Sequence, residues 1–441
     1  MNSLNIWVGD TLAAALSEEE NTFSLAYTEV WNAQGYAFSP HLPLNVLSSG
    51  AAVRNFFSNL LPEGQLLEGL SQAYQVSQFD VFGILRKVGE DCAGALVLSD
   101  LVQSSLEESL GNSHVATKDN YQEISEQDLN ARIEESTAQN TPLMMWNMIP
   151  RMSLAGVQNK LGVYIDTEDR LFLPIASAPT SHILKPDNLN GKHPNIAANE
   201  YFCMRLAHQI GLNVPDTSYR KLPTPIFLIK RYDRIWTNDG RLIRSHQIDG
   251  CQALNLPPNL KYEQEYRDGP QGATIASLLT LAKLCKVPAI AQQQLLTWLL
   301  FNYLIGNSDA HAKNISFLVN HHLFDERNHI VIDAGIKVAP FYDLVCGTVY
   351  GYQDLAQSIG GENEIPFITR LEWKRFTDEC GISFVIVQKI AQQLVKKITM
   401  CLPSLAEHTK NYTNQPIIEE IASAINLHCS YLNESLISKV N

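Results

Sequence analysis

The sequence lacks the cysteine patterns that mark secreted scaffolds and zinc sites. Its eight cysteines include no CxxC pair and follow no regular spacing, which excludes a disulfide framework and a zinc ribbon. The first twenty residues contain four carboxylates and no lysine or arginine, whereas secretory and transit peptides begin with basic residues. These absences predict a cytoplasmic protein with reduced, buried thiols.

Long hydrophobic runs are missing as well. The most apolar stretch, residues 295–306, is interrupted by Asn302 and is shorter than the about 20 residues that a membrane-spanning helix needs. We interpret it as a buried core helix. No period of about 20–50 residues repeats, so solenoids and propellers are not expected. With 441 residues, of which 45% are hydrophobic, the chain is long enough for two or three domains.

Basic residues are scarce in the first third of the chain. Residues 1–140 hold 5 Lys and Arg against 19 Asp and Glu, whereas the remaining residues hold 28 against 27. An acidic surface of this kind does not bind the phosphates of DNA by itself. The acidic part either keeps the protein soluble or provides a docking surface for a partner, and the sequence leaves both interpretations open.

Hydrophobic periodicity divides the chain into four parts. Residues 1–105 mix strand-like and helical runs and predict a small α+β domain. Residues 106–143 are polar and acidic and predict a linker. Residues 144–270 contain several β-branched runs around one helix at 196–211 and predict a β-rich lobe. Residues 271–441 predict an all-helical lobe. A β-rich lobe followed by a helical lobe is the order found in two-lobed, protein-kinase-like folds.

The strongest local signal is GNSDAHAKN at residues 306–314, after a long apolar helix and before a strand-like run. Asp309 and Asn314 are five residues apart, the interval at which protein kinases place the carboxylate that accepts the substrate proton and an amide ligand of magnesium. Lys313 is a candidate to neutralise the transferring phosphoryl group, and His311 to contact phosphate. The alternative is an ordinary polar turn.

Two further charged groups complete a candidate kinase site. Asp343, in VAPFYDLVCG, is placed to supply a second oxygen ligand for magnesium, although DLV replaces the DFG of ordinary kinases. Lys185 ends the strand-like run SHILK and is a candidate to bind the α and β phosphates, with Glu200 on the next helix to orient it. Taken singly, Asp343 is equally explained as a turn residue and Lys185 as a solvated lysine.

The segment SLAGVQNK at residues 153–160 precedes a strand. It offers successive backbone N–H groups that can wrap phosphates, with Lys160 behind them. It matches neither the Walker pattern nor the GxGxxG loop of ordinary kinases. By composition alone it is a hairpin turn.

Seven motifs, taken in order, resemble those of the HipA family, the toxin kinases of bacterial HipBA toxin–antitoxin systems. They are RMSLAGVQNK, SHILKPD, NEYFCMRLAHQIGLNVP, KRYDR, QIDGCQALNLP, GNSDAHAKN and PFYDLV. With NFFSNLLPEG near the N-terminus, the resemblance covers nearly the whole chain. It implies a HipA-like α+β fold and an ATP- and Mg²⁺-dependent Ser/Thr kinase that phosphorylates a translation component such as an aminoacyl-tRNA synthetase. It also implies a helix-turn-helix antitoxin of the HipB type, through which the protein reaches DNA.

The resemblance assigns roles to individual residues. Asp309 becomes the catalytic proton acceptor, and Asn314 and Asp343 become the magnesium ligands. The implied nucleotide contacts are Ala155, Gly156, Val157, Gln158, Asn159, Lys160, Lys185, Lys230, Arg231, Tyr232, His311 and Tyr342. Ser153 falls on the family's inactivating autophosphorylation serine, where a phosphate would repel those of ATP.

Two features depart from the family pattern. Lys230 occupies a hinge position that often holds a carboxylate, which alters the side-chain contacts expected with adenine. Residues 361–366, GENEIP, are acidic where some members have a basic run, so we do not expect direct DNA contact. Two alternatives to an active toxin kinase stay open. One is a nucleotide-binding corepressor subunit with weak or no kinase activity. The other is a small-molecule or lipid kinase, which the lack of an amphipathic membrane segment disfavours.

Overall fold

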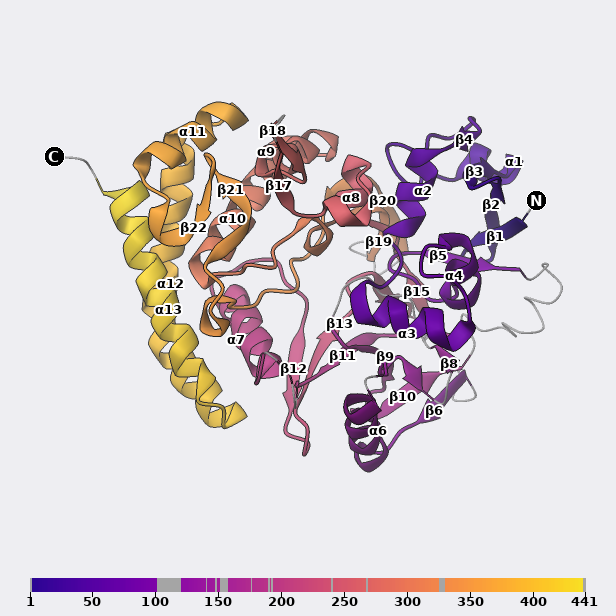
Figure 1. Ribbon diagram of the computed structural model, residues 1–441, viewed down its shortest axis with the longest axis horizontal. Helices are drawn as coiled ribbons and strands as arrows, with labels where there is room; N and C mark the ends of the chain where they lie inside the picture. Colours follow the sequence, from indigo (N-terminus) through magenta and orange to yellow (C-terminus); the bar gives the residue numbers. More distant parts are fainter. Residues whose placement is uncertain are drawn as a thin grey trace.

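A computed structural model describes residues 2–100, 120–139, 141–146, 149–150, 158–175, 177–188, 191, 193–238, 241–266, 269–324 and 330–438. The N-terminal sheet and the C-terminal helices lie at opposite ends of the molecule, with a second sheet between them (Figure 1). Among these residues no helix is both long and apolar enough to cross a membrane.

The N-terminal region is an antiparallel sheet with the strand order β4-β3-β2-β1-β5. Its strands are β1 (Asn2–Val8), β2 (Thr11–Glu19), β3 (Thr22–Tyr27), β4 (Ser48–Ser49) and β5 (Leu96–Ser99). Its helices are α1 (Glu29–Gln34), α2 (Ala51–Ser58), α3 (Gly64–Tyr74) and α4 (Val81–Val88). Leu4 and Ile6 of β1 are fully buried because alternate residues of a strand share one face.

The second sheet has six strands in the order β12-β13-β11-β9-β10-β6. They are β6 (Tyr121–Glu123), β9 (Leu161–Ile165), β10 (Leu171–Pro174), β11 (His182–Pro186), β12 (Thr217–Arg220) and β13 (Ile226–Lys230). Both faces are covered, because apolar residues of β13 alternate between two cores. Phe227 and Ile229 join α7 (Ile196–Gln209) in the main core, whereas Ile226 and Leu228 join α6 (Glu126–Gln139) in a second core.

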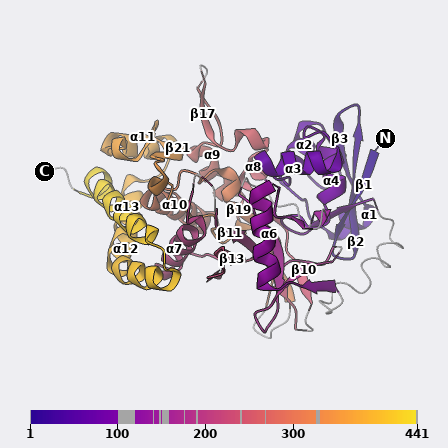
Figure 2. The ribbon, with the colours of Figure 1, turned by 60° about the horizontal axis from the view of Figure 1, so that its bottom comes forward.

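The prediction of a linker over residues 106–143 is wrong for the part that contains β6 and α6. Strand β6 pairs with β10, and α6 buries Leu129 and Ile133 against the sheet. Figure 2 shows α6 beside this sheet, away from the C-terminal helices. The helix was missed because its apolar stripe is only two residues wide in an otherwise polar sequence. Residues 101–119 lie outside the described residues.

The C-terminal region is built around α10 (Pro288–Ile305), which is apolar on most sides and largely buried, as expected for a core helix. The helices α11 (Arg370–Cys380), α12 (Phe384–Thr413) and α13 (Ile417–Leu432) follow it in the chain. The prediction of an all-helical lobe is wrong. Strands β19 (Ser316–Phe324) and β20 (Ile330–Val338) form a sheet with β16 (Gln247–Asp249), and β21 (Asp354–Ile359) pairs with β22 (Glu362–Glu364). The run ISFLV after Asn314 was the sequence signal for β19.

The remaining described strands and α-helices are short. They are β7 (Met145–Trp146), β8 (Ile149–Pro150), β14 (Arg234–Trp236), β15 (Leu242–Arg244), β17 (Glu263–Tyr266), β18 (Gly269–Gly272), α8 (Gly250–Leu254) and α9 (Ile275–Thr280). All eight cysteines are unpaired and six of them are buried, as their irregular spacing predicts.

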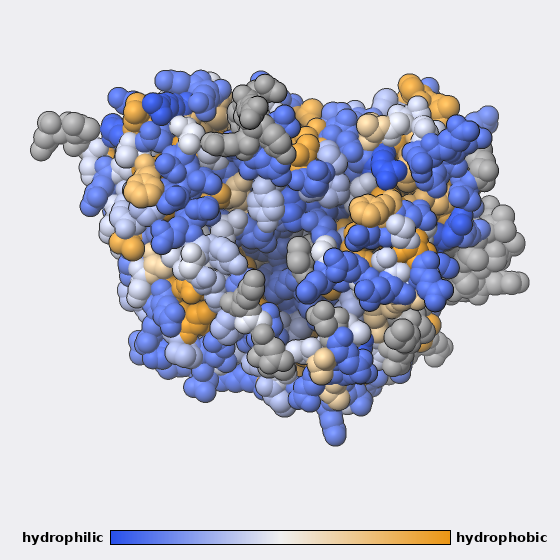
Figure 3. Space-filling view, in the orientation of Figure 1, coloured by the Kyte–Doolittle hydropathy of each residue, from blue (hydrophilic) through white to orange (hydrophobic). Residues whose placement is uncertain are grey.

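One hydrophobic core links the N-terminal sheet to the C-terminal helices. It contains Leu4 of β1, Phe202 of α7, Ile305 of α10 and Leu432 of α13. The N-terminal region therefore shares its core with the rest of the chain. A hollow lined mainly by hydrophilic residues opens near the centre of the face in Figure 3, between the two ends of the molecule.

Candidate active site

Three charged side chains from separate elements meet beside the second sheet. The Nζ atom of Lys185, on β11, donates to Oε1 of Glu200, on α7, at 2.7 Å and also to Oδ1 of Asp343. The Lys185 and Glu200 side chains are 4% and 0% exposed. Asp343, in the loop after β20, has a φ of 53°, a left-handed conformation that is uncommon outside glycine and often found at functional sites.

The electrostatics of this cluster follow from its burial. Burial raises the pKa of Glu200 to about 7 even though Lys185 opposes the shift. Burial acts in the same direction on Asp343, but Lys185 and Lys160 outweigh it and hold the pKa of Asp343 below its usual range. The pKa of Lys160 is lowered to about 8 by burial, opposed by Asp343. Two lysines and two carboxylates thus share one site, in which only Asp343 is open to solvent, with 27% of its side chain exposed.

A short loop that begins at the end of α10, residues 306–314, holds Asp309 and Asn314 and is the expected catalytic loop. Gly306 ends the helix with a φ of 64°, and a Cβ atom there would lie 2.1 Å from Oγ1 of Thr348. Asn307 then fixes the loop, because its Nδ2 donates to the carbonyl of Asp343 at 3.1 Å and its Oδ1 accepts from the Asp309 amide at 3.1 Å. The loop is thereby attached to the backbone of Asp343.

Asn314 closes the loop at its other end. It is the last residue of η4 (Ala312–Asn314), a 3-10 turn, and its Nδ2 donates to the carbonyl of Asp309 at 2.7 Å. Because this hydrogen bond uses the side-chain nitrogen, the side-chain oxygen Oδ1 is the atom that Asn314 can offer to a cation.

Asp309 is the most accessible member of the site, with 64% of its side chain exposed. Its Oδ1 accepts a hydrogen bond of 2.5 Å from the hydroxyl of Tyr262 and lies 3.7 Å from Nε2 of His311. The rings of Tyr262 and His311 pack edge to face at 5.0 Å. Burial lowers the pKa of His311 to about 4, so this histidine is neutral at physiological pH.

Lys313 does not occupy the position expected of a phosphoryl-neutralising group. Its Nζ atom pairs with Oε1 of Glu63 at 2.7 Å and donates to the carbonyl of Asn59 at 3.1 Å, and its side chain is 1% exposed. Both partners belong to the N-terminal region. The lysine is therefore a structural contact of the catalytic loop.

Part of the expected nucleotide loop lies outside the described residues, namely Ser153, Ala155, Gly156 and Val157. Its last residue, Lys160, is buried close enough to Asp343 and Lys185 for each to shift its pKa. The side chain of Asn159 has structural partners instead, because it accepts from the Leu143 amide at 2.8 Å and donates to Ser136 at 3.0 Å. Gln158 stands beside them, half-buried.

The three expected hinge residues point in different directions. Lys230 is exposed, with its Nζ atom 3.7 Å from Asp216. Tyr232 lies with its ring 5.9 Å from that of Tyr342, whose hydroxyl donates to the carbonyl of Lys313 at 2.8 Å. These two tyrosines connect the hinge to the catalytic loop. The structure does not bring the side chain of Arg231 to this site.

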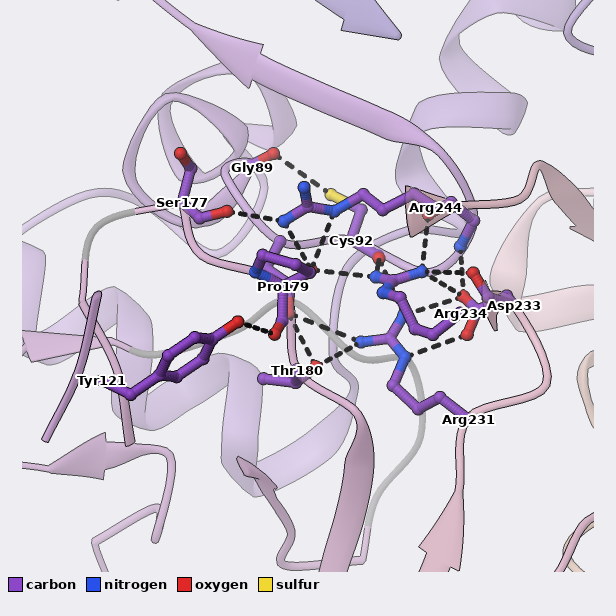
Figure 4. A network of polar contacts seen from close by, with 12 residues as sticks. Gly89, Cys92, Tyr121, Ser177, Pro179, Thr180, Arg231, Asp233, Arg234 and Arg244 are labelled. Carbon is purple, nitrogen blue, oxygen red and sulfur yellow. Dashed lines mark hydrogen bonds and ion pairs between the residues drawn. The ribbon is translucent and has the colours of Figure 1, made fainter. Parts of the chain in front are cut away.

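Arg231 belongs to a buried network of charges between the hinge and the N-terminal region. Its guanidinium donates to both oxygens of Asp233, at 3.0 and 2.8 Å, and Arg234 and Arg244 converge on the same place (Figure 4). Asp91 accepts from Arg234 at 2.9 Å and from Arg244 at 3.2 Å. Three guanidinium groups and two carboxylates are thus sequestered from water, which makes the hinge and the N-terminal region one unit.

The donor set fits a magnesium ion that is shared with a nucleotide. Asn314 and Asp343 offer oxygen atoms, which are the ligands Mg²⁺ prefers, and such ions keep waters and phosphate oxygens as further ligands. In the described residues there is no group of three or more His, Cys, Asp or Glu that could hold a metal alone. The buried Nδ1 of His311 has no hydrogen-bond partner among these residues, which fits a polar group of a bound nucleotide.

Sequence reasoning missed several residues around the site. Tyr262 and Glu63 contact the catalytic loop from distant parts of the chain, and Asp91 anchors the arginines of the hinge. Glu63 stands in NFFSNLLPEG and Arg234 in KRYDR. These motifs were noted for their resemblance, but nothing in their spacing indicates which charges meet.

Comparisons with known proteins cover both ends of the chain. The family model of the HipA-like C-terminal domain matches residues 152–402, and that of the HipA N-terminal domain matches residues 4–99. The serine/threonine-protein kinase toxin HipA of Shewanella oneidensis is 28% identical over 93% of this chain and 92% of its own. Y4mE of Sinorhizobium fredii, which is named as a kinase, is 32% identical over 96% of both chains.

A solved structure gives the same result for the fold. The Shewanella oneidensis HipA, from a complex with HipB and operator DNA, superposes with a TM-score of 0.75 at 27% identity, over 97% of this chain and 95% of the other. The predicted α+β, kinase-like fold is confirmed by this likeness.

Proposed function

The chain belongs to the HipA family of serine/threonine kinases, and on this premise we propose that it is a toxin kinase that phosphorylates a translation component and is neutralised by a HipB-like antitoxin. The substrate class we propose is an aminoacyl-tRNA synthetase. The antitoxin is a helix-turn-helix protein, so that this chain reaches DNA only through its partner. We place the complex in the cytoplasm.

One observation carries the catalytic part of this proposal. Lys185 is held between Glu200 and Asp343, and the carbonyl of Asp343 is bonded to the loop that carries Asp309. A lysine fixed by a helix glutamate beside a magnesium-binding aspartate is the arrangement with which protein kinases bind ATP phosphates. A corepressor that only binds the nucleotide has no need of the proton acceptor Asp309 beside this arrangement.

The residues divide the reaction among them. Asp309 accepts the proton of the substrate hydroxyl while the serine or threonine oxygen forms a bond to the γ-phosphorus. The bond from that phosphorus to the β–γ bridging oxygen breaks, and ADP leaves. Lys185 offsets charge on the phosphates. Magnesium, when held by Asn314 and Asp343, would neutralise the charge that develops on the phosphate oxygens.

The experiment is transfer of labelled phosphate from MgATP to the purified protein and to a bacterial lysate. Asp309→Asn is expected to lose the label about 1,000-fold or more while it still binds MgATP, because only the proton acceptor is removed. The matched control is Asp378→Asn, an exposed aspartate of α11. A wild-type protein that binds ATP without transferring phosphate would favour the corepressor alternative.

We further propose that Ser153 is an autophosphorylation site that switches the kinase off. A phosphate on Ser153 would add about two negative charges beside the segment that is expected to bind the phosphates of ATP. Ser153→Ala is expected to remain active and to lose its own label, as mass spectrometry would detect. Loss of activity as complete as in Asp309→Asn would contradict this assignment.

A further inference from the structure

Glu63 of the N-terminal region lies between two lysines at the catalytic loop. Its Oε1 is 2.7 Å from Nζ of Lys313, and its Oε2 is 2.6 Å from Nζ of Lys261. The Lys313 and Lys261 side chains are 1% and 9% exposed, whereas that of Glu63 is 18% exposed. One carboxylate thus pairs with two ammonium groups that have almost no access to water.

Both lysines are parts of the machinery around Asp309. Lys313 is the residue before Asn314, inside the 3-10 turn η4. The backbone carbonyl of Lys261 accepts a hydrogen bond of 3.1 Å from the amide of Ala312 in the same turn. The neighbour of Lys261 is Tyr262, which donates to Asp309 at 2.5 Å. Glu63 therefore holds the catalytic loop and the segment that covers it in one position.

Asp249 is also near enough to Lys313 for the lysine to act on its pKa, but its Oδ1 accepts from the Gln252 amide at 2.8 Å and caps α8. It is therefore not placed to replace Glu63. The two lysines outweigh the effect of burial on Glu63 and lower its pKa to about 2. Without the carboxylate, two buried ammonium groups would face each other, which is strongly unfavourable.

The surrounding contacts make the placement of Glu63 rigid. Asn55 donates to the carbonyl of Asn255 at 2.9 Å and Asn59 to that of Leu256 at 2.8 Å. Gln252 in turn donates to the carbonyl of Phe56 at 3.0 Å. These bonds join α2 to the segment after α8, so Glu63 is presented by a fixed scaffold.

We propose that Glu63 is a positioning residue for phosphoryl transfer, so that the N-terminal region completes the active site by fixing the loop of Asp309 and Asn314. This inference rests on the proposed kinase function. It assigns the acidic N-terminal region a part in catalysis besides any docking role. A partner that moved this region would also change the rate of transfer.

The test compares full-length variants for the initial rate of phosphate transfer from MgATP, for MgATP affinity and for melting temperature. Glu63→Gln keeps the size of the side chain and removes its charge. We expect the transfer rate at saturating MgATP to fall about 10- to 100-fold, the range found when loop geometry is lost. The Kd for MgATP should change much less, within about threefold, because Lys185 and Asp343 lie outside the loop that Glu63 fixes and still hold the phosphates and the magnesium. Glu68→Gln, an exposed change in α3, is the matched control and should transfer like the wild type.

A double variant separates positioning from general stability. In Glu63→Gln with Lys313→Met, one unpaired ammonium group is gone, so we expect at least about fivefold recovery over Glu63→Gln. If Glu63→Gln does not fold, Glu63→Asp keeps the charge one methylene shorter and should transfer about 3- to 10-fold more slowly than the wild type.

The outcomes distinguish this inference from the proposed function. If the wild type is active and Glu63→Gln or Glu63→Asp transfers phosphate at the wild-type rate, the inference is overturned and the proposed function is not. A loss of transfer that only follows the loss of folding and of MgATP affinity, without recovery in the double variant, overturns it as well. An inactive wild type would overturn the proposed function and this inference together.

Discussion

The buried charge network beside the hinge gives a sharp prediction for Asp91→Asn. Asp91 is 3% exposed and accepts hydrogen bonds from Thr180, Arg234 and Arg244 at 2.9, 2.9 and 3.2 Å. Burial by itself would raise its pKa, but the neighbouring arginines lower it, so it is charged in the folded protein. The asparagine would turn an NH₂ group toward donors and leave three guanidinium groups with one carboxylate.

The size of the effect follows from this geometry. Removing one partner of a buried ion pair destabilises a protein by about 3–5 kcal/mol. Unfolding entropy is about 2.1 cal/mol/K per residue, or about 0.9 kcal/mol/K if the 441 residues unfold together, as the shared core indicates. We therefore expect the melting temperature to fall by about 3–5 °C in a calorimetric scan, with a single transition.

The control and the rescue come from the same chain. Asp378→Asn changes the same functional group at an exposed site and should shift the free energy of unfolding by no more than about 0.5 kcal/mol. Asp91→Asn with Arg244→Gln removes one charge of each sign, so its loss should be smaller than the sum of the two single losses. The expected fall is about 3–5 °C, so a melting temperature for Asp91→Asn within about 1 °C of the control would refute the reasoning.

Three further predictions concern the site and its protonation. Glu200→Gln should raise the Kd for MgATP about tenfold, because the phosphate-binding lysine loses a charge-assisted hydrogen bond. Unchanged affinity in titration calorimetry would contradict this. Tyr262→Phe should raise kcat/KM about fivefold, because the substrate hydroxyl no longer competes with a bond of about 1 kcal/mol to Asp309; a fivefold fall would instead make Tyr262 a support of Asp309. His182, His246 and His311 have pKa values lowered to about 4, with burial as the largest cause. Between pH 6.5 and 4 the unfolded chain therefore binds more protons at these sites, and their contribution to stability falls by up to about 4 kcal/mol for each unit by which the pH is lowered. Urea unfolding at pH 7, 6 and 5 should give a slope of the free energy of unfolding against pH that is about 1.4 kcal/mol per unit lower in His246→Gln than in the wild type, and an unchanged slope would exclude His246 from it.

The excess of acidic residues in the N-terminal region has a second explanation in the structure. Part of its negative charge is not at the surface. Glu63 and Asp91 are buried or nearly so and neutralise lysines and arginines of the kinase part. An excess of carboxylates in the first 140 residues thus reflects charge pairing across the molecule as well as solubility.

Several features followed from the sequence alone because they depend on local order. The apolar stretch at residues 295–306, interpreted as a buried core helix, forms the C-terminal part of α10 and ends at the cap residue Gly306, where glycine readily takes the left-handed conformation. The strand-like run SHILK at residues 181–185 coincides with β11, and the strand expected after residue 160 is β9. The interval between Asp309 and Asn314 predicted that one loop carries both groups, and their hydrogen bond spans that interval.

Other features depended on contacts that no local pattern encodes. The helix α6 lies in a polar segment, and only the sheet next to it makes its two apolar residues a core. Arg231 was expected at the nucleotide because the resemblance places it in the hinge, and Lys313 because its charge could neutralise the transferring phosphoryl group. Their side chains meet Asp91, Asp233 and Glu63 instead.

The sequence by itself determined which groups are available for phosphoryl transfer, in what order they stand and which of them share a loop. Only the tertiary structure decided which charges neutralise one another. Glu63 and Lys313 are 250 residues apart in the chain, yet their side-chain atoms lie 2.7 Å apart. The reason is physical, because a buried charge is stable only beside an opposite charge, and which opposite charge lies beside it depends on how distant elements pack.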